Sequence, residues 1–424
     1  MTAKLLLISL RDPFLDSDRV MPPLGVMSLQ SYMLSLGFDS SIENNFDLDS
    51  VEKYSGYTHF AISCMTPQKS QAVEILHGIK SGLKNKTVII GGPHAGFYLE
   101  DCLKEPYDYI IRGDGEYSLK AVMEGRAGQR VLDMPVSSGE MNELPVPYRE
   151  PEFLKQYNFD IQGISSSTVL TAKGCPMSCA FCEDAGTKVR LYNPRNIDRQ
   201  IRDVLNAGFK GIMFFDDIFA ISKKRVRDLA PVIGKHGAPY RCFGHAGKMD
   251  DEMAGLLSES GCVEIGFGAE SGSGKILEAI GKRVTVEENM KFIEICNKHK
   301  IKVKAFIILG LPGENLFTVN ETRKFLDALM SNKFTNSFGR EITNDFDITV
   351  YFPYRGTKIR DSMDKNPGSY DISFTRNPED LKGFYKGKGG EAEIAVRTSR
   401  LGSSLIQKIQ RELLAEYKAR VIAG

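Results

Sequence analysis

Residues 174–182 read GCPMSCAFC, and this short stretch indicates what fold and chemistry to expect. Cys175, Cys179 and Cys182 follow one another in the spacing C-x3-C-x2-C. Thiolates on one tight loop bind soft metals. A structural zinc site needs four closed ligands, and the sequence suggests only the distant His245 as a fourth. A [4Fe–4S] cluster held by three cysteines leaves one iron open for a substrate, and this is the interpretation that the loop favours.

The chain that surrounds this loop alternates strand-like and helical segments from residue 168 onward. The strand-like runs are TVLTAKG, KGIMFFDD, YRCFGH, VEIGFGAES, KVKAFIILG and FDITVYF. About six βα units predict a partial, TIM-like (β/α)6 barrel over residues 166–360, with its site at the carboxyl ends of the strands. Thr285 and Glu288 form a predicted capping box at the start of one barrel helix.

A second alternation fills residues 1–130, with the apolar runs KLLLISL, HFAISCM, TVIIGG and DYIIRG between helical patterns. Continuous apolar strands that alternate with helices predict a parallel sheet covered on both faces, of the Rossmann or flavodoxin type. Such sheets bind ligands outside the carboxyl ends of their strands. The whole chain is therefore expected to be an α/β protein.

Two stretches fall outside these alternations. Residues 131–165 are irregular and rich in proline, which predicts a linker, and residues 361–424 form a C-terminal region assigned to substrate recognition by elimination. The lysine- and glycine-rich segment 385–393 is typical of a solvated loop. The chain ends in a helical pattern whose apolar stripe is typical of core packing. That stripe consists of Leu405, Ile409, Leu413, Tyr417 and Val421.

Composition narrows the class of protein. A chain of 424 residues is too long for one ordinary core, and its 55 basic and 54 acidic residues give no surplus for nucleic acid. No run approaches the roughly 18 apolar residues of a membrane span. The eight cysteines occur without a secretion signal, which favours free thiols and a metal site over disulfides. We therefore expect a cytoplasmic protein.

The segment AKGCPMSCAFC resembles the signature of the radical S-adenosylmethionine (SAM) enzymes, in which an aromatic residue, here Phe181, precedes the third cysteine. The resemblance implies that the three cysteines hold a [4Fe–4S] cluster whose open iron chelates the amino and carboxylate groups of SAM. An electron from the reduced cluster then releases a 5′-deoxyadenosyl radical. A reductant such as flavodoxin or ferredoxin is the implied partner.

Further segments resemble this family in the same order along the chain. FFDDIFA carries Asp216 and Asp217, and FPYRGT (352–357) resembles a late turn, with Arg355 where proline is usual. GFGAESGS and AFIILGLPGE resemble the segments that contact SAM. The SAM contacts implied in these two segments are Gly268, Glu270, Ser271, Gly310 and Leu311.

The N-terminal segments PPLGVMSLQSYMLSLG, AISCMT, VIIGGPHAG and IIRGDGE resemble the cobalamin (B12)-binding-type domain fused to one radical SAM subgroup. The implied cobalamin contacts are Pro23, Gly25, Ser63, Thr66, Gly91, Gly92, Gly113 and Glu116. The stretch after the first strand has no histidine, so the cobalt would lack a protein ligand. His94 is in the wrong place for that role and is expected to cap or pack. A domain that keeps the fold without the cofactor is the alternative.

Three residues are candidates for catalysis. Asp216 and Asp217 end a barrel strand, where one carboxylate is expected to orient a substrate hydroxyl or amine and the other to cap the next helix. His245 is either a proton-transfer group at the barrel rim or a satisfied structural histidine. Cys242 on the same strand is expected to be a buried structural thiol rather than a thiol that quenches radicals.

The reaction favoured by these features is cobalamin-dependent methylation of an unactivated carbon in a small molecule. A radical dehydratase, epimerase or ring-rearranging enzyme whose first domain binds no cobalamin is the alternative within the same class. A non-enzymatic cobalamin or iron–sulfur sensor is the alternative outside it, and it would need no SAM segments. The neutral charge and the lack of a basic appended domain favour a small-molecule substrate over a nucleic acid.

Overall fold

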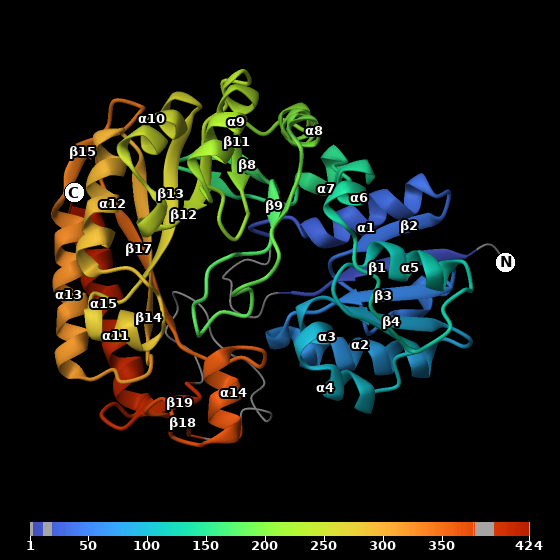
Figure 1. Ribbon diagram of the computed structural model, residues 1–424. Coiled ribbons are helices and arrows are strands. Elements are labelled where there is room, and N and C mark those ends of the chain that lie inside the picture. Colours follow the sequence, from blue (N-terminus) through green and yellow to red (C-terminus); the bar gives the residue numbers. More distant parts are fainter. Residues whose placement is uncertain (1–2, 12–18, 376, 378–393, 424) are drawn as a thin grey trace. The chain divides into compact units, whose positions relative to one another are not determined.

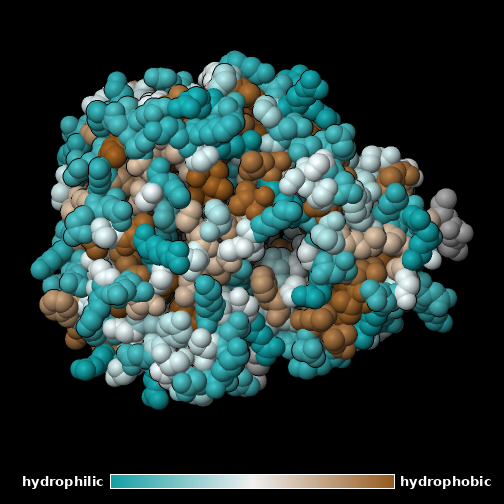
Figure 2. Space-filling view, in the orientation of Figure 1, coloured by the Kyte–Doolittle hydropathy of each residue, from teal (hydrophilic) through white to brown (hydrophobic). Residues whose placement is uncertain are grey.

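A computed structural model describes residues 3–11, 19–375, 377 and 394–423 (Figure 1). The chain forms two compact units, Met1–Asn158 and Phe159–Gly424. The predicted solvated loop at 385–393 lies outside the described residues. Within the described part, no helix combines the length and the apolar character that a membrane crossing requires. The surface turned to the viewer in Figure 2 is mostly hydrophilic and carries separate apolar patches.

The first unit is built on a six-stranded parallel sheet in the order β2-β1-β3-β4-β5-β6. Its strands are β1 (Lys4–Ser9), β2 (Asp39–Glu43), β3 (His59–Ser63), β4 (Thr87–Gly91), β5 (Tyr109–Ile111) and β6 (Val131–Leu132). Helices α1 (Leu24–Ser35) and α5 (Glu116–Met123) lie on one face, and α2 (Lys69–Gly82), α3 (Pro93–Phe97) and α4 (Leu99–Lys104) lie on the other (Figure 1). This flavodoxin-like order confirms the expected fold and places a topological switch point between β1 and β3.

Strand β1 shows why both faces of this sheet are covered. Leu5 and Leu7 join the apolar cluster that contains α1 and α5, whereas Leu6 and Ile8 join the cluster that contains α2, α3 and α4. All four side chains are at most 2% exposed. The burial of each side chain stabilises the folded state by roughly 1.5–3 kcal/mol, so a charged residue at any of these positions would destabilise the sheet.

Residues 131–158 belong to the first unit, which corrects the predicted linker at 131–165. Strand β6 pairs with β5, and it is followed by α6 (Ser138–Glu143) and α7 (Pro151–Leu154). The prolines interrupt the apolar pattern that would indicate a strand in the sequence. A strand of only two residues nevertheless pairs with β5 at the edge of the sheet. The second unit begins at residue 159, and β7 (Asp160–Ile161) already pairs with the first barrel strand.

The second unit is built on a seven-stranded sheet in the order β17-β14-β13-β12-β11-β8-β7. Its parallel strands are β8 (Ile164–Val169), β11 (Gly211–Phe214), β12 (Tyr240–Gly244), β13 (Cys262–Glu270), β14 (Lys302–Leu309) and β17 (Asp345–Val350). The helices between them are α8 (Pro194–Asn206), α9 (Lys223–Gly234), α10 (Asp251–Glu259), α11 (Gly274–Ala279), α12 (Val286–Lys298) and α13 (Leu316–Ser331). Parallel strands in chain order confirm the partial barrel, and Thr285 and Glu288 form the predicted capping box of α12.

The concave face of this sheet is filled in layers below the carboxyl ends of the strands. The lowest layer is ionic, with Arg241 and Glu264 3.1 Å apart. The next layer is aromatic, because the rings of Phe243 and Phe306 lie 5.9 Å apart. Gly266 lies between these rings, and a Cβ atom there would be 2.8 Å from Phe243. These layers close the bottom of the barrel and leave its carboxyl end for a site.

The C-terminal region packs against the barrel. It contains the antiparallel pair of β18 (Ile372–Phe374) with β19 (Val396–Thr398) and the helices α14 (Lys358–Lys365) and α15 (Ser403–Ala423). A separate hairpin of β15 (Lys333–Thr335) with β16 (Glu341–Thr343) precedes the last barrel strand. Gln410 of α15 donates a hydrogen bond to the carbonyl of Ile348 in β17. Ile409 and Leu413 of the predicted apolar stripe are buried, and Leu405 is half-buried. The side chains of Tyr417 and Val421 lie outside the described part.

Candidate functional site

The three-cysteine loop follows β8 and is closed by the short pairing of β9 (Ala172–Lys173) with β10 (Arg190–Leu191). Gly174 has φ +90°, and a Cβ atom there would lie 2.5 Å from the carbonyl oxygen of Lys188. The N–H of Ala180, inside the loop, donates to the carbonyl of Ile280 at 2.9 Å. The carbonyl of Ala180 accepts from the N–H of Ile359 at 3.1 Å. Backbone bonds on both sides therefore hold the loop in place.

The chemistry of the three thiols fits a cluster with an open iron. Burial raises the pKa of each thiol, that of Cys182 to about 11, and a thiolate at Cys179 raises the pKa of Cys175 and Cys182 further. Bound metal offsets this cost, because it favours the thiolate. Among the described residues, no three His, Cys, Asp or Glu side chains are placed to hold a single metal ion. That finding covers the three cysteines as well, so it does not choose between zinc and iron; the choice rests on ligand number, since three cysteines suffice for a [4Fe–4S] cluster and structural zinc needs a fourth ligand.

Asp216 and Asp217 hold the chain that leads into this loop. Asp216 accepts hydrogen bonds from the N–H groups of Thr171 at 2.6 Å and Ala172 at 3.1 Å, and from the hydroxyl of Thr171. Asp217 accepts from the N–H of Gly174 at 3.1 Å. These contacts favour a positioning role for both carboxylates, and contact with a substrate stays a prediction.

Asp216→Ala is expected to lower the iron content of the reconstituted protein and to destabilise the fold by about 2–4 kcal/mol. The reason is that Asp216 is 2% exposed, so its loss leaves two backbone N–H groups buried without an acceptor. Asp216→Asn keeps one acceptor and should retain part of both properties. Iron analysis and urea unfolding measure the two effects. Full iron loading in Asp216→Ala would contradict the positioning role.

Glu270 and Lys282 form a buried ion pair beside the loop. Glu270 ends β13 with φ +60°, next to a bulge in its pairing with β14. Its Oε1 lies 2.7 Å from Nζ of Lys282, and both side chains are at most 8% exposed. Gly268 makes room for the pair, because a Cβ atom there would lie 2.7 Å from Nζ of Lys282. Lys282 also lies 6.0 Å from the ring centre of Phe181.

Burial raises the pKa of Cys179, and the positive charge of Lys282 in this pair opposes the rise. The buried ammonium therefore stabilises negative charge at the cysteine loop. Lys282 is not among the residues that the sequence predicts for the site. No motif marked it, since it lies in the loop that follows α11.

Ser271 anchors the end of β13 to α13. It is fully buried, its hydroxyl lies 3.1 Å from that of Thr322, and it accepts a hydrogen bond from the N–H of Ser273 at 3.2 Å. These partners favour a structural role for the hydroxyl, and its predicted contact with SAM stays a prediction.

Gly310 and Leu311 form the turn after β14, and Glu314 closes it. Gly310 has φ +79°, and its N–H donates to Oε2 of Glu314 at 2.6 Å. Oε1 of Glu314 has no partner among the described residues. The hydroxyl of Thr398 donates to the carbonyl of Glu314 at 2.8 Å, so the C-terminal region is tied to this turn. Burial raises the pKa of Glu314 to about 8.

Stability is expected to fall as the pH rises through the window between 4.5, the ordinary value for Glu314, and about 8. The folded chain binds the proton more tightly than the unfolded chain in this window, so ionisation opposes folding. Glu314→Gln keeps an acceptor for Gly310 and cannot ionise. This variant should leave the free energy of unfolding unchanged near pH 5 and raise it by roughly 1–3 kcal/mol near pH 8.5. Urea unfolding at both pH values measures this, with Glu321→Gln as the control, and a larger gain at the lower pH would contradict it.

His245 follows β12 at the same end of the barrel. Both ring nitrogens are buried and have no hydrogen-bond partner among the described residues. Burial, and then the charges of Lys282 and Lys248, lower its pKa to about 4, so the ring is neutral at pH 7. A neutral imidazole without a partner can accept a hydrogen bond or a proton. This favours a ring that faces a ligand over a satisfied structural histidine. Cys242, in contrast, is fully buried with its sulfur 3.9 Å from that of Cys262, as a structural thiol would be.

In the first unit, the predicted cobalamin residues gather at the carboxyl edge of the sheet. Ser63 and Gly91 end neighbouring strands and are partners in the register of β3 and β4. Gly92 has φ +90°, and a Cβ atom there would lie 2.8 Å from the carbonyl oxygen of Cys64. Gly113, after β5, has φ +67°. Glycine at these places leaves the edge free of side chains, which fits a large ligand.

The other predicted residues of this edge have mixed surroundings. His94 is buried, stacks on Tyr98 with ring centres 5.1 Å apart, and has Nδ1 3.4 Å from the hydroxyl of Thr66. It therefore packs, as expected, and occupies one side of the Thr66 hydroxyl. Glu116 is the buried first residue of α5. At the start of α1, Pro23 precedes the helix and Gly25 is exposed.

Comparison with known families and proteins supports this division of the chain. The model of the radical SAM superfamily matches residues 169–326, and the model of the B12 binding domain matches residues 15–123. An uncharacterized methyltransferase of Pyrococcus horikoshii is 26% identical over 324 residues, which cover 70% of this chain and 67% of the relative.

Two solved structures have a similar fold. The radical SAM methyltransferase TsrM from Kitasatospora setae, with cobalamin and a [4Fe–4S] cluster bound, has a TM-score of 0.69 at 15% identity and covers 99% of this chain and 89% of that one. The cobalamin-dependent radical SAM enzyme OxsB, with aqua-cobalamin and SAM bound, has a TM-score of 0.66 at 20% identity. That match covers 77% of this chain and 53% of OxsB, so this chain spans about half of the OxsB chain.

Proposed function

The chain is a radical SAM protein with an N-terminal B12-binding domain, and from this premise we propose that it is a cobalamin-dependent methyltransferase that acts on carbon in a small molecule. One observation carries the proposal. The same chain has a three-cysteine loop at the carboxyl end of a partial barrel and a glycine-lined carboxyl edge on a B12-type sheet. When bound, the [4Fe–4S] cluster and SAM supply a radical that removes a substrate hydrogen, and cobalamin carries the methyl group.

The residues of the chain position these groups and exclude water. Asp216 and Asp217 fix the entry to the cysteine loop, and the pair of Glu270 with Lys282 fixes the end of β13 beside it. The aromatic layer of the barrel closes the site from below, which keeps water from a reactive radical. A reductant must supply electrons to the cluster, and the substrate class is a small molecule.

His245→Phe is expected to lower methyl transfer about a hundredfold, because the variant keeps a ring and loses both nitrogens that would act on the substrate. SAM cleavage without substrate and cobalamin retention should not change. His77→Phe, at an exposed histidine of the first unit, is the control. Loss of substrate-free SAM cleavage in His245→Phe would assign the ring to cofactor binding instead.

The proposed function is tested by anaerobic reconstitution of the cluster, addition of hydroxocobalamin, and gel filtration. The loaded protein is then incubated with methyl-labelled SAM and the small-molecule fraction of source cells. Retained stoichiometric cobalamin, a labelled product, S-adenosylhomocysteine and 5′-deoxyadenosine are the expected result. A normal cluster without retained cobalamin, and 5′-deoxyadenosine alone, would overturn the proposal in favour of a radical dehydratase, epimerase or ring-rearranging enzyme.

A further inference from the structure

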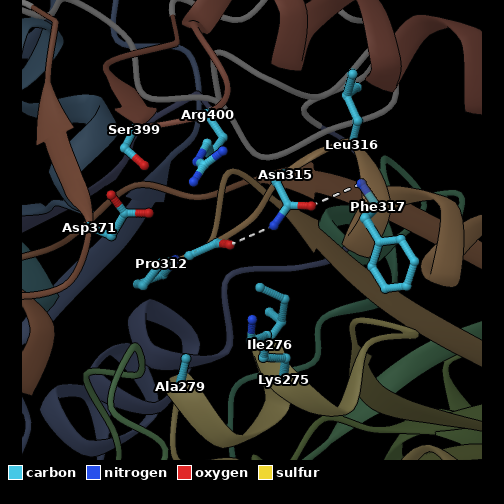
Figure 3. A pocket seen from close by; sticks show the side chains of 11 residues that line it. Lys275, Ile276, Ala279, Pro312, Asn315, Leu316, Phe317, Asp371, Ser399 and Arg400 are labelled. Atoms are coloured by element: carbon cyan, nitrogen blue, oxygen red, sulfur yellow. Dashed lines mark hydrogen bonds between the residues drawn. The ribbon is translucent and has the colours of Figure 1, made fainter.

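An open cavity of about 720 Å³ lies on the second unit (Figure 3). It is lined by α11, by the turn that leads into α13 and by residues next to the β18–β19 hairpin. In Figure 3, Arg400 extends toward the cavity from one side, and Ile276 and Ala279 of α11 lie on the opposite side. The three cysteines and the five residues named as SAM contacts do not line this cavity, whereas Pro312 and Gly313, which follow two of those contacts, do.

Two large apolar side chains are exposed at the edge of this cavity. Leu316 is 60% exposed and Phe317 is 71% exposed, the highest values among the exposed large apolar residues of the described part. They form the first turn of α13, where the side chain of Asn315 accepts from the N–H of Phe317 at 2.9 Å. The first helical turn is thus capped without help from these two side chains. Adjacent exposed apolar residues are typical of a surface that binds another protein.

The charges around α11 differ between its two sides. Lys275 and Arg400 line the cavity, and neither has an ion-pair partner among the described residues. Among the described residues of this lining, Asp371 is the one carboxylate. A second cavity, of about 700 Å³, borders the same helix and is lined by the carboxylates Glu278, Glu287, Glu288 and Glu321 together with Arg283. An acidic partner would therefore be attracted to the first cavity and repelled from the second.

Helix α11 connects the first cavity to the cysteine loop. Ala279 lines the cavity, and the next residue, Ile280, accepts the hydrogen bond from Ala180 at 2.9 Å. Ala180 lies between Cys179 and Cys182, and consecutive Cα atoms are about 3.8 Å apart. A Cβ atom on Gly281 would lie 3.9 Å from the carbonyl oxygen of Ser178, so the chain after α11 packs directly on the loop. A protein that covers this cavity would therefore contact the helix that packs on the cysteine loop.

We propose that Lys275, Leu316, Phe317 and Arg400 form a docking surface, here called the donor surface, for a small acidic electron-transfer protein of the flavodoxin type. The docked donor loses one electron and the [4Fe–4S] cluster gains it, with no bond made or broken at the interface. The inference rests on the proposed function, since it requires the cluster. Electron-transfer complexes have some of the smallest protein interfaces, under about 1,200 Å², so a few residues can make a large part of one.

The test uses the full-length reconstituted protein and purified flavodoxin under anaerobic conditions. The double variant Lys275→Glu with Arg400→Glu, and separately Phe317→Ser, are compared with Lys291→Glu, which reverses an exposed lysine on α12. We expect the Kd for flavodoxin to rise about tenfold or more in the double variant, and its dependence on salt to weaken. Phe317→Ser should raise the Kd at every salt concentration, and Lys291→Glu should not change it.

A second measurement separates this inference from the proposed function. SAM cleavage driven by dithionite, which needs no protein donor, should be equal in all variants, whereas cleavage driven by reduced flavodoxin should fall with binding. An unchanged Kd in the double variant, or an equal rise in Lys291→Glu, would overturn the donor surface and leave the enzymatic function untouched. Absence of dithionite-driven cleavage in the unmodified protein would instead contradict the proposed function.

Discussion

Replacement of Cys175, Cys179 or Cys182 by alanine is expected to abolish the visible absorbance of the reconstituted cluster and all SAM cleavage. Each cysteine is predicted to supply one of three protein ligands, and alanine supplies none. The five other cysteines of the described residues are buried outside this loop, so none of them replaces the lost ligand. Visible spectra, iron and sulfide analysis, and 5′-deoxyadenosine formation measure the effect.

Cys296→Ala is the matched control for this prediction. Cys296 is a fully buried free cysteine in the same unit, on α12, away from the loop. Its replacement removes a buried thiol without removing a ligand, so iron content and spectrum should be those of the unmodified protein. An intact cluster spectrum in any of the three loop variants would refute the assignment of the loop.

The sequence allowed the main architecture to be predicted because the decisive signals are local. Each apolar strand is a short continuous run in the sequence, which predicts a sheet covered on both faces. The structure confirms this, because Leu5 and Leu7 pack on one face and Leu6 and Ile8 on the other. The three cysteines of the loop are likewise close in sequence, so their spacing alone indicates the chemistry. The capping box of Thr285 and Glu288 is confirmed for the same reason.

Contacts between distant residues could not be predicted in this way. The sequence predicts that one of Asp216 and Asp217 orients a substrate and the other caps a helix. It does not show the partners of Asp216, because Thr171 and Ala172 lie at another strand end, about one βα unit away in the chain. The edge strand Val131–Leu132 could not be predicted, because the prolines that follow it in the sequence indicate an irregular segment. Glu314 was part of a motif, yet only the fold shows that one of its carboxylate oxygens is buried without a partner.

The ion pair of Glu270 with Lys282 leads to the second prediction with a large effect. Lys282→Met is expected to destabilise the protein by about 3–5 kcal/mol, because it leaves the buried carboxylate of Glu270 without its partner. Burial lowers the pKa of Lys282, but the charges of Glu270 and Cys179 offset this and raise it, so the ammonium is retained in the folded state. Urea unfolding of the protein before cluster reconstitution measures this loss, with Lys291→Met as the control.

The same variant should shift the reduction potential of the cluster to a more negative value. Reduction adds negative charge to the cluster, and the nearby ammonium stabilises that charge. Of the two members of the pair, Lys282 has the larger effect on the pKa of Cys179. The loss of the ammonium should therefore lower the potential, whatever smaller effect the carboxylate of Glu270 has on it. Spectroelectrochemical titration measures the potential, and an unchanged value would limit Lys282 to a structural role.

The double variant Lys282→Met with Glu270→Gln separates the two roles of the pair. Without the unpaired buried charge, most of the lost stability should return, because removing both members of a buried pair costs far less than removing one. The potential should remain below that of the unmodified protein, since the ammonium is still absent. Gly268→Ala provides an independent comparison, because its Cβ atom would displace the pair while both charges remain. If stability and potential recovered together in the double variant, the charge of Lys282 would have no effect on the cluster beyond holding Glu270 in place.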